Sequence, residues 1–485
     1  MATNKAKTEK EMNPYLQEIR DNLSRFLENI SCLRDTYEDT ERTLLKQKKG
    51  AEKKYNELIK GFPVETETGE MDIPTRHYRE FQKKERHKKR TERALALVPQ
   101  SYLVSLVSLY DQFYAGLVRL IYRIEPEKLK ESNKTFCYRD LCDYSSVQEV
   151  KVEIVDEQVE DLLRESHVKQ FEWLANAMGL ATLKSFSEWA AFVELTERRN
   201  LFVHSDGVVS QQYINVCNGE NVCLPKGIAK GSQLMVDKNY FEHAFKTLYV
   251  VGIKLTQMLA HTVYDKQYSN DYESIDKILI SNVYELIAEE LYDVAISVSE
   301  FAHDDKFIGP RHNGHDRCFI LLNYAQAYKW NGQDDKCQML LAATDCTTWK
   351  DDLLIPKLTL EGKFDEVYEK MRTVGDKSDI LTPESYRQWP IFKEIRREKQ
   401  FAEVFKEIFG EELETSIQWK VFDDFITYSR QLYTDNLVEL SEPKKSDKDS
   451  GVFYFEFTDE FKKLCSGLKD KEDEDEDDEG AEEKK

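Results

Sequence analysis

Hydrophobic residues in the first sixty positions of the chain recur every seven residues. The repeat and its companion positions are Leu16, Leu23, Ile30, Tyr37, Leu44, Ala51 and Leu58, with Ile19, Phe26 and Leu33. Such a heptad predicts a long helix whose apolar seam needs a partner, either a second chain or an antiparallel return. Gly61 and Pro63 predict its end, and a second helix from Pro74 onward is expected to fold back on it. Residues 1–93 are predicted to form a helical arm, and both partners remain open.

The next block is predicted to be a helical bundle over residues 94–268. Positions 102–124 are apolar on nearly every side, which indicates a central helix with one acidic residue in its middle, Asp111. Ser146 followed by Glu149 is a capping-box pattern that predicts the start of another helix. Further helical stretches are expected at 171–180, 186–199 and 240–264. The glycines and the proline of 218–237 predict an irregular insertion.

Short paired helices with recurring turns are expected over residues 275–410. Three turns lead into helical segments at Glu290, Gly332 and Gly362. Their offsets bracket the length of about 34 residues of a helix-turn-helix repeat, and three such units would bury their apolar faces on one another. Residues 411–468 are predicted to form a C-terminal segment with one strand candidate at 452–458.

Composition agrees with an all-α fold and adds a tail. The 485 residues include only 19 glycines and 11 prolines, whereas 33% are charged. Residues 470–485 hold eleven acidic side chains and three lysines, a net charge of −8, so the segment 469–485 is predicted to be a disordered acidic tail. The start of the chain lacks an apolar leader, and no run of 18 apolar residues predicts a membrane span. Nine cysteines at irregular spacings favour free thiols in the cytoplasm.

The net charge of −22 does not exclude an RNA partner, because charge of the other sign is concentrated locally. Residues 83–93 contain seven basic and two acidic side chains, a net of +5. Basic side chains bind nucleic acids through the phosphates. The RNA-binding candidates are Lys83, Lys84, Arg86, Lys88, Lys89 and Arg90.

Most catalytic sequence signatures are absent. The chain has no phosphate-binding glycine loop, no nucleophile elbow and no His-Glu-x-x-His pair. His312, His315 and Cys318 are spaced like metal ligands, but they adjoin two turns and lack an evident fourth ligand, so a polar loop is favoured there. Cys217 and Cys223 are interpreted as buried thiols. The sequence therefore predicts neither a metal nor a cofactor.

The residues that best suit catalysis lie between 192 and 214. Arg199, Asn200 and His204 form an Arg-Asn-x-x-x-His sequence, in which the last two share one face of a helix and the long arginine can reach it. Glu194 lies one turn before Arg198 and is expected to hold it by a charge-assisted hydrogen bond. Imidazole moves protons near neutral pH, and a guanidinium stabilises charge on a pentacovalent phosphate. Such a set suits metal-independent RNA cleavage, in which the 2′-hydroxyl is the nucleophile.

The alternative for the same residues is an amphipathic helix with an arginine–glutamate pair and a hydrogen-bonded histidine. The sequence around the motif favours the first interpretation, since three stretches resemble the HEPN domain of prokaryotic defence proteins: VSLVSLYDQFYAGLVRLIY, RESHVKQFEWLANAMGL and ELTERRNLFVHSDGVVSQQYI. The resemblance covers about residues 95–264. It implies a helical bundle, often a metal-independent ribonuclease, whose motif positions here are Arg199, Asn200 and His204. It also implies a homodimer in which two motifs face one composite site.

The block at 275–410 resembles tetratricopeptide-like repeats, and its pairing with a HEPN-like domain is similar to phage-defence effectors of the toxin or abortive-infection kind. The leading hypothesis is thus a cytoplasmic homodimeric endoribonuclease that cleaves RNA, with Glu194, Arg198 and Asp111 supporting the motif. Its repeats would bind a regulatory protein. The alternative is a non-catalytic scaffold in which the bundle dimerises and the repeats bind protein.

Overall fold

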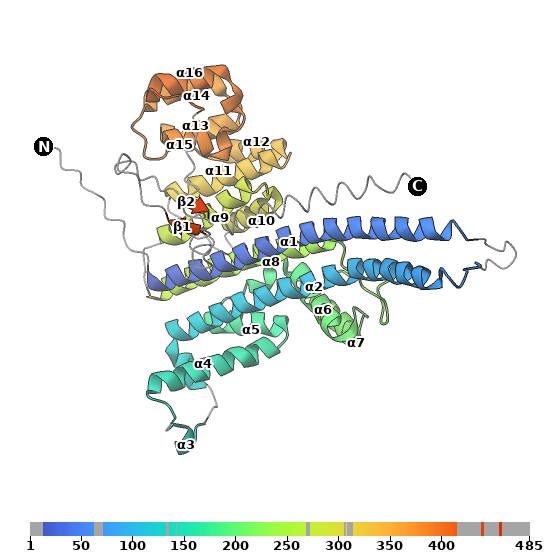
Figure 1. Ribbon diagram of the computed structural model, residues 1–485. Coiled ribbons are helices and arrows are strands. Elements are labelled where there is room, and N and C mark those ends of the chain that lie inside the picture. The colour runs from blue at the N-terminus through green and yellow to red at the C-terminus, as the bar shows by residue number, and fades with distance from the viewer. Residues whose placement is uncertain are drawn as a thin grey trace. The chain divides into compact units, whose positions relative to one another are not determined.

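The computed structural model describes residues 13–62, 71–131, 135–141, 143–267, 272–304, 307, 314–414, 438–440 and 455–457 (Figure 1). Helices account for about three quarters of these residues, which confirms the predicted all-α class. Contacts divide the chain into one unit that extends to Glu411 and a second from Glu412 onward. In the second unit, β1 (Val438–Leu440) pairs antiparallel with β2 (Phe455–Phe457), which lies inside the predicted strand segment.

The heptad seam is filled from within the chain. Helix α1 (Pro14–Ile59) starts after Asn13, whose side chain accepts a hydrogen bond from the Tyr15 amide at 2.8 Å. It pairs with α2 (Tyr78–Ile124) as the antiparallel return and also packs on α8 (Lys238–Gln267) (Figure 1). The seam residues that are buried in these contacts are Leu16, Ile19, Leu23, Phe26, Ile30, Tyr37 and Ala51. Of the two partners that the heptad left open, this structure contains the antiparallel return.

Close packing between α1 and its neighbours depends on small residues. A Cβ atom at Gly252 of α8 would lie 2.6 Å from the Phe26 ring, and one at Gly116 of α2 would lie 2.4 Å from the Asn22 side chain. The Asn22 amide in turn donates to the Phe113 carbonyl at 3.0 Å. A side chain at either glycine would push the helices apart. Its absence lets the three helices pack closely into one core.

Helix α2 joins the predicted arm to the predicted bundle without a break. It runs through residues 93 and 94, where the sequence placed a boundary, and continues past Pro99 to Ile124. Its second half is buried on nearly every side, as expected for a central helix. It is also the one helix of the described ranges whose length and composition would allow a membrane span, a test that core helices pass too.

Shorter helices surround this core. They are η1 (Pro126–Glu131), α3 (Tyr138–Leu141), α4 (Val147–Arg164), α5 (His167–Met178), η2 (Leu183–Ser185), α6 (Trp189–Ser205) and α7 (Gln211–Gly219). The predicted cap is present, because Ser146 Oγ accepts from the Glu149 amide at 3.3 Å. Residues 220–237 connect α7 to α8, and Val208 forms an antiparallel bridge with Gln233.

The last helices of the first unit are arranged as pairs joined by tight turns. They are α9 (Tyr272–Ala288), α10 (Tyr292–His303), α11 (Gly314–Trp330), α12 (Asp334–Ala343), α13 (Asp351–Leu360), α14 (Phe364–Val374), α15 (Pro383–Gln388), η3 (Pro390–Phe392), η4 (Ile395–Arg397) and α16 (Lys399–Phe409). Glu290, Gly332 and Gly362 have φ values of 59°, 74° and 74°, and a helix starts two residues after each. The three turns aligned in the sequence therefore share one left-handed conformation.

Some predictions fall on residues without a described structure. They include the acidic tail at 469–485 and His312, and nothing is described of the His315 side chain. Within the described ranges, no group of three or more His, Cys, Asp or Glu side chains is placed to hold a metal. Cys217 and Cys223 are free thiols. Cys217 is buried as expected, whereas Cys223 is exposed, because it lies in the irregular connection after α7.

Candidate functional site

Helix α6 presents the Arg-Asn-x-x-x-His residues near its C-terminal end. The helix ends at Asp206, which adopts a left-handed conformation with φ of 50°. Phe192 and Leu201 of this helix are buried in the core. Arg199 and Asn200 are partly buried, and His204 is exposed. The structure therefore holds the start of the motif firmly and leaves the imidazole accessible.

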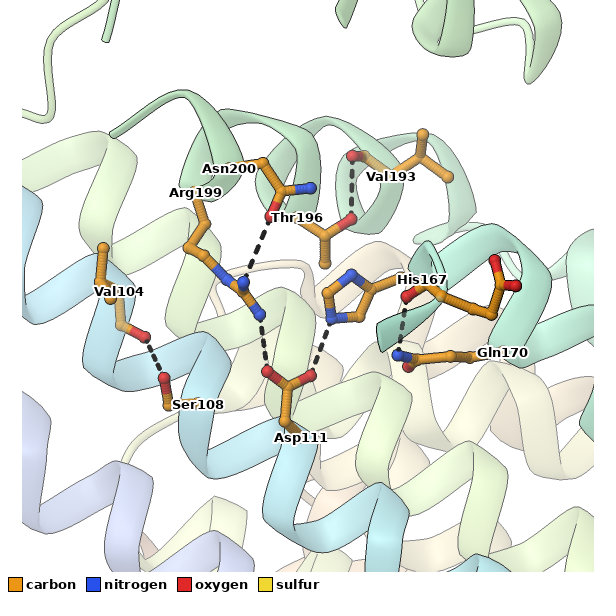
Figure 2. Close-up of polar contacts among 10 residues, drawn as sticks. Val104, Ser108, Asp111, His167, Gln170, Val193, Thr196, Arg199 and Asn200 are labelled. Carbon is orange, nitrogen blue, oxygen red and sulfur yellow. Dashed lines mark hydrogen bonds and ion pairs between the residues drawn. The ribbon is translucent and has the colours of Figure 1, made fainter. Parts of the chain in front are cut away.

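Arg199 is fixed by a carboxylate from a distant part of the chain. Its Nη2 donates to Asp111 Oδ2 at 2.6 Å, and its Nη1 donates to Asn200 Oδ1 at 3.2 Å (Figure 2). Asp111 lies in the middle of α2 and uses its other oxygen, Oδ1, to contact His167 Nε2 at 2.9 Å. One carboxylate thus connects the guanidinium on α6 with an imidazole on α5.

Asn200 and Glu197 form a second polar contact on α6. Burial raises the pKa of the Glu197 carboxyl, and the Arg199 charge and a hydrogen bond with the Asn200 side chain partly oppose that effect. Glu197 is only 5% exposed. A buried carboxyl whose protonation is favoured in this way lies directly beside the motif.

The motif residues share one pocket. Arg199, Asn200 and His204 line a cavity of about 500 Å³ together with His167, Glu197 and Ser210. Residues from the end of α4, the start of α5 and the loop before α7 complete its walls. A cavity of this size admits a nucleotide-sized ligand. It brings together two imidazoles and the guanidiniums of Arg199 and Arg164, groups able to transfer protons and stabilise anionic charge.

Arg198, the neighbouring arginine, lies in a different environment. Its Nε donates to Glu194 Oε1 at 2.7 Å, as the sequence predicted, and its Nη1 donates to the Met235 carbonyl at 3.1 Å. Tyr213 and Tyr240 also donate to Glu194, at 2.7 Å and 2.6 Å. Burial, together with the Glu194 charge, raises the pKa of both tyrosines. This buried cluster supports the helix and is not part of the pocket lining.

The basic run lies in the first third of α2. Lys84 pairs with Glu80 at 2.9 Å, and Lys89 pairs with Glu85 at 2.6 Å. Lys88 lies 4.7 Å from the centroid of a tyrosine ring of α1. The side chains of Lys83, Arg86 and Arg90 are exposed. Part of the predicted RNA-binding charge is therefore offset by neighbouring glutamates, and none of these six residues lines the pocket.

A larger cavity, of about 730 Å³, lies between α1, α2 and α4 and contains none of the predicted motif residues. Two of the three arginines that line it pair with carboxylates: Arg119 with Asp156 at 3.0 Å, and Arg123 with Glu18. Its lining residues include no histidine, so the smaller pocket on α6, which has two, is the better candidate for proton transfer.

Sequence reasoning missed two residues of the pocket, His167 and Glu197. His167 stands in one of the three stretches that carry the HEPN resemblance, but its contact with Asp111 spans 56 positions of the chain. Glu197 sits between the motif and the Glu194–Arg198 pair and reads as an ordinary exposed glutamate. Hydrophobic periodicity marks faces of helices and says nothing about which polar side chains meet across them.

Comparisons with known proteins leave the site to be judged on its own geometry. No family model, no curated protein and no solved structure matches the chain.

Proposed function

We propose that the chain is a metal-independent endoribonuclease of the HEPN type. The observation that supports this proposal is the shared pocket, because Arg199, Asn200 and His204 all line the same cavity. An accessible imidazole beside a held guanidinium is suited to phosphodiester cleavage through the 2′-hydroxyl.

In this mechanism His204 takes the proton from the 2′-hydroxyl of the ribose. The resulting oxygen attacks the neighbouring phosphorus, and the guanidinium of Arg199 stabilises the added negative charge. Asn200 orients the guanidinium through its side-chain oxygen, 3.2 Å from Nη1. The reaction ends in a 2′,3′-cyclic phosphate and a free 5′-hydroxyl. Neither a metal nor a cofactor takes part.

The wider setting of the proposal follows the resemblance stated above. The enzyme would act in the cytoplasm as a homodimer and as an effector of phage defence or abortive infection. The basic run on α2 would guide RNA, and the helix pairs α9–α16 would act as tetratricopeptide-like repeats that bind a regulatory protein. Light scattering on the intact protein should give about twice the 57.0 kDa chain mass. A monomer at micromolar concentration would contradict the dimer.

A non-catalytic scaffold is the second candidate function. The observation in its favour is the 2.6 Å contact between Arg199 and Asp111, because a guanidinium already paired with a carboxylate is typical of structural ion pairs as well. In that case the pocket would bind no RNA, and the bundle would serve dimerisation alone.

One experiment separates the two functions. Purified wild-type protein and His204→Ala are incubated with total RNA and with transfer RNA, with and without a chelator. We expect wild-type cleavage that survives chelation, and a loss of about 10²–10⁴-fold in the variant at nearly unchanged melting temperature. His243→Ala is the matched control, since His243 is an exposed histidine of α8 outside the pocket. Full cleavage by His204→Ala, or its unfolding, would contradict the catalytic assignment.

A further inference from the structure

The pocket contains a second histidine that the Arg-Asn-x-x-x-His motif does not include. His167 is the first residue of α5, directly after Ser166, whose hydroxyl accepts from the Lys169 amide at 3.4 Å and fixes the start of the helix. The His167 side chain is 5% exposed, yet it lines the same cavity as His204. A buried imidazole that borders a polar pocket has a defined orientation toward whatever enters it.

We propose that His167 is the general acid of the reaction and that Asp111 holds it in place. The inference rests on the ribonuclease function proposed above and names the donor that protonates the leaving 5′-oxygen. One chain would then supply both proton-transfer groups, with His204 as the base and His167 as the acid.

The contact with Asp111 determines which nitrogen of His167 is available. A carboxylate only accepts hydrogen bonds, so the 2.9 Å contact assigns a proton to Nε2. Nδ1, on the other side of the ring, is then the atom that can exchange a proton with a ligand (Figure 2). A carboxylate paired with an imidazole in this way orients the ring and stabilises its protonated form.

Charged groups of both signs lie around His167. Asp111 and Glu165 are its acidic neighbours, whereas Arg199 and the N-terminal end of α5 carry positive charge. The other titratable or charged groups of the pocket are Arg164, Glu197 and His204.

Atoms and charges balance in the complete step. His204 removes the 2′-hydroxyl proton, the O2′–P bond forms, and the P–O5′ bond breaks. Nδ1–H of protonated His167 delivers its proton to O5′. The products are a 2′,3′-cyclic phosphate and a 5′-hydroxyl, and the enzyme is left with neutral His167 and protonated His204. Water returns both groups to their starting states, and no oxidant or metal is required.

The test compares two substrates whose leaving groups differ in their need for an acid. RNA has a poor leaving group, whereas a nucleoside 3′-(4-nitrophenyl phosphate) releases 4-nitrophenolate, which needs no proton. We expect His167→Gln, whose amide can still donate to Asp111, to lower RNA cleavage by about 10²–10⁴-fold and to leave cleavage of the aryl ester near the wild-type rate. His204→Ala should lose both activities, because both substrates need the base.

A measurement on the wild-type protein covers the case in which His167→Gln fails to fold. The rate of RNA cleavage should follow a bell-shaped pH profile, in which the fall at high pH reports loss of the proton from the general acid. With the aryl ester, which needs no acid, this fall at high pH should be absent. Equal losses on both substrates in His167→Gln, or the same fall at high pH with both, would overturn the assignment and make His167 a positioning residue. Absence of RNA cleavage by the wild type would instead refute the ribonuclease function itself.

Discussion

Two consecutive arginines of α6 occupy opposite kinds of environment. Arg198 is enclosed by Glu194, the Met235 carbonyl and the ring of Tyr240, whose centroid lies 3.9 Å from the guanidinium carbon. Arg199 is held by Asp111 and by the Asn200 side chain, and it borders the pocket. Successive residues of a helix point about 100° apart, so one arginine faces the connection before α8 and the other faces α2 and α5.

The difference shows how two adjacent charged side chains come to lie in a closed network and in a network that reaches a pocket. Glu194 receives bonds from an arginine and two tyrosines, which leaves that cluster closed to a ligand. Asp111 receives bonds from Arg199 and His167, and both of these partners also line the cavity. A network whose members reach a pocket can exchange charge and protons with a ligand, whereas a closed network can only stabilise the fold.

The largest effect is expected from breaking the closed cluster. Glu194→Ala leaves the buried Arg198 charge and two tyrosine hydroxyls without their acceptor, which should lower the free energy of unfolding by about 3–5 kcal/mol. Urea denaturation measures the change. The matched control is Glu160→Ala, which removes a glutamate that faces an arginine at the same spacing but in solvent; its unfolding should be unchanged. Equal stability of the two variants would show that the cluster is not the stabilising element.

The next largest effect is expected on activity, from a change at Arg199, the arginine that borders the pocket. Arg199→Ala removes the group that we propose to stabilise charge on the phosphate, so cleavage should fall about a hundredfold, or by roughly 2.7 kcal/mol of transition-state stabilisation. Single-turnover cleavage of RNA measures it. The control is Arg119→Ala, which removes an exposed arginine that pairs with an aspartate in the other cavity. If Arg199→Ala cleaves RNA at the wild-type rate but has a lower melting temperature, then Arg199 stabilises the fold, as Arg198 does, and has no role in cleavage.

A smaller effect, a gain of stability rather than a loss, is expected from a change at Glu197, which lies beside Arg199. Burial raises the pKa of Glu197 in the folded protein, so the folded state binds its proton more tightly than the unfolded state. The ionised carboxylate therefore costs stability at neutral pH, and this cost disappears as the pH falls below the ordinary glutamate value of about 4.3. Glu197→Gln should raise the melting temperature at pH 7, and the gain should vanish near pH 3. A gain that is independent of pH would exclude ionisation as its cause.

The smallest effect is expected from the acidic residues at 470–485, whose composition predicts a solvated tail. Deletion of residues 470–485 removes a net charge of −8 and should leave the melting temperature nearly unchanged. The deletion should increase nonspecific RNA binding, because the tail no longer competes for the basic run at 83–90. Calorimetry and a filter-binding titration at fixed salt measure the two quantities. A large loss of melting temperature would show that the tail packs on the folded chain.

Local pattern was sufficient to predict much of the helical architecture. The heptad from Leu16 onward predicted α1 and its end, the apolar stretch at 102–124 predicted the buried half of α2, and Ser146 predicted the start of α4. The Glu194–Arg198 pair also followed from spacing, since its members are four residues apart on one helix. Each of these features depends on residues within a few turns of one another.

Tertiary structure decided what distant residues do. A seam of heptads is the same pattern whether it meets another chain or an antiparallel return, and only the fold puts α2 and α8 against it. Asp111 lies 88 positions from Arg199 and 56 from His167, so no spacing rule connects them. The adjacent arginines have the same chemistry in the sequence. Their surroundings differ because helix rotation aims one at a buried glutamate and the other at a pocket, which local sequence does not encode.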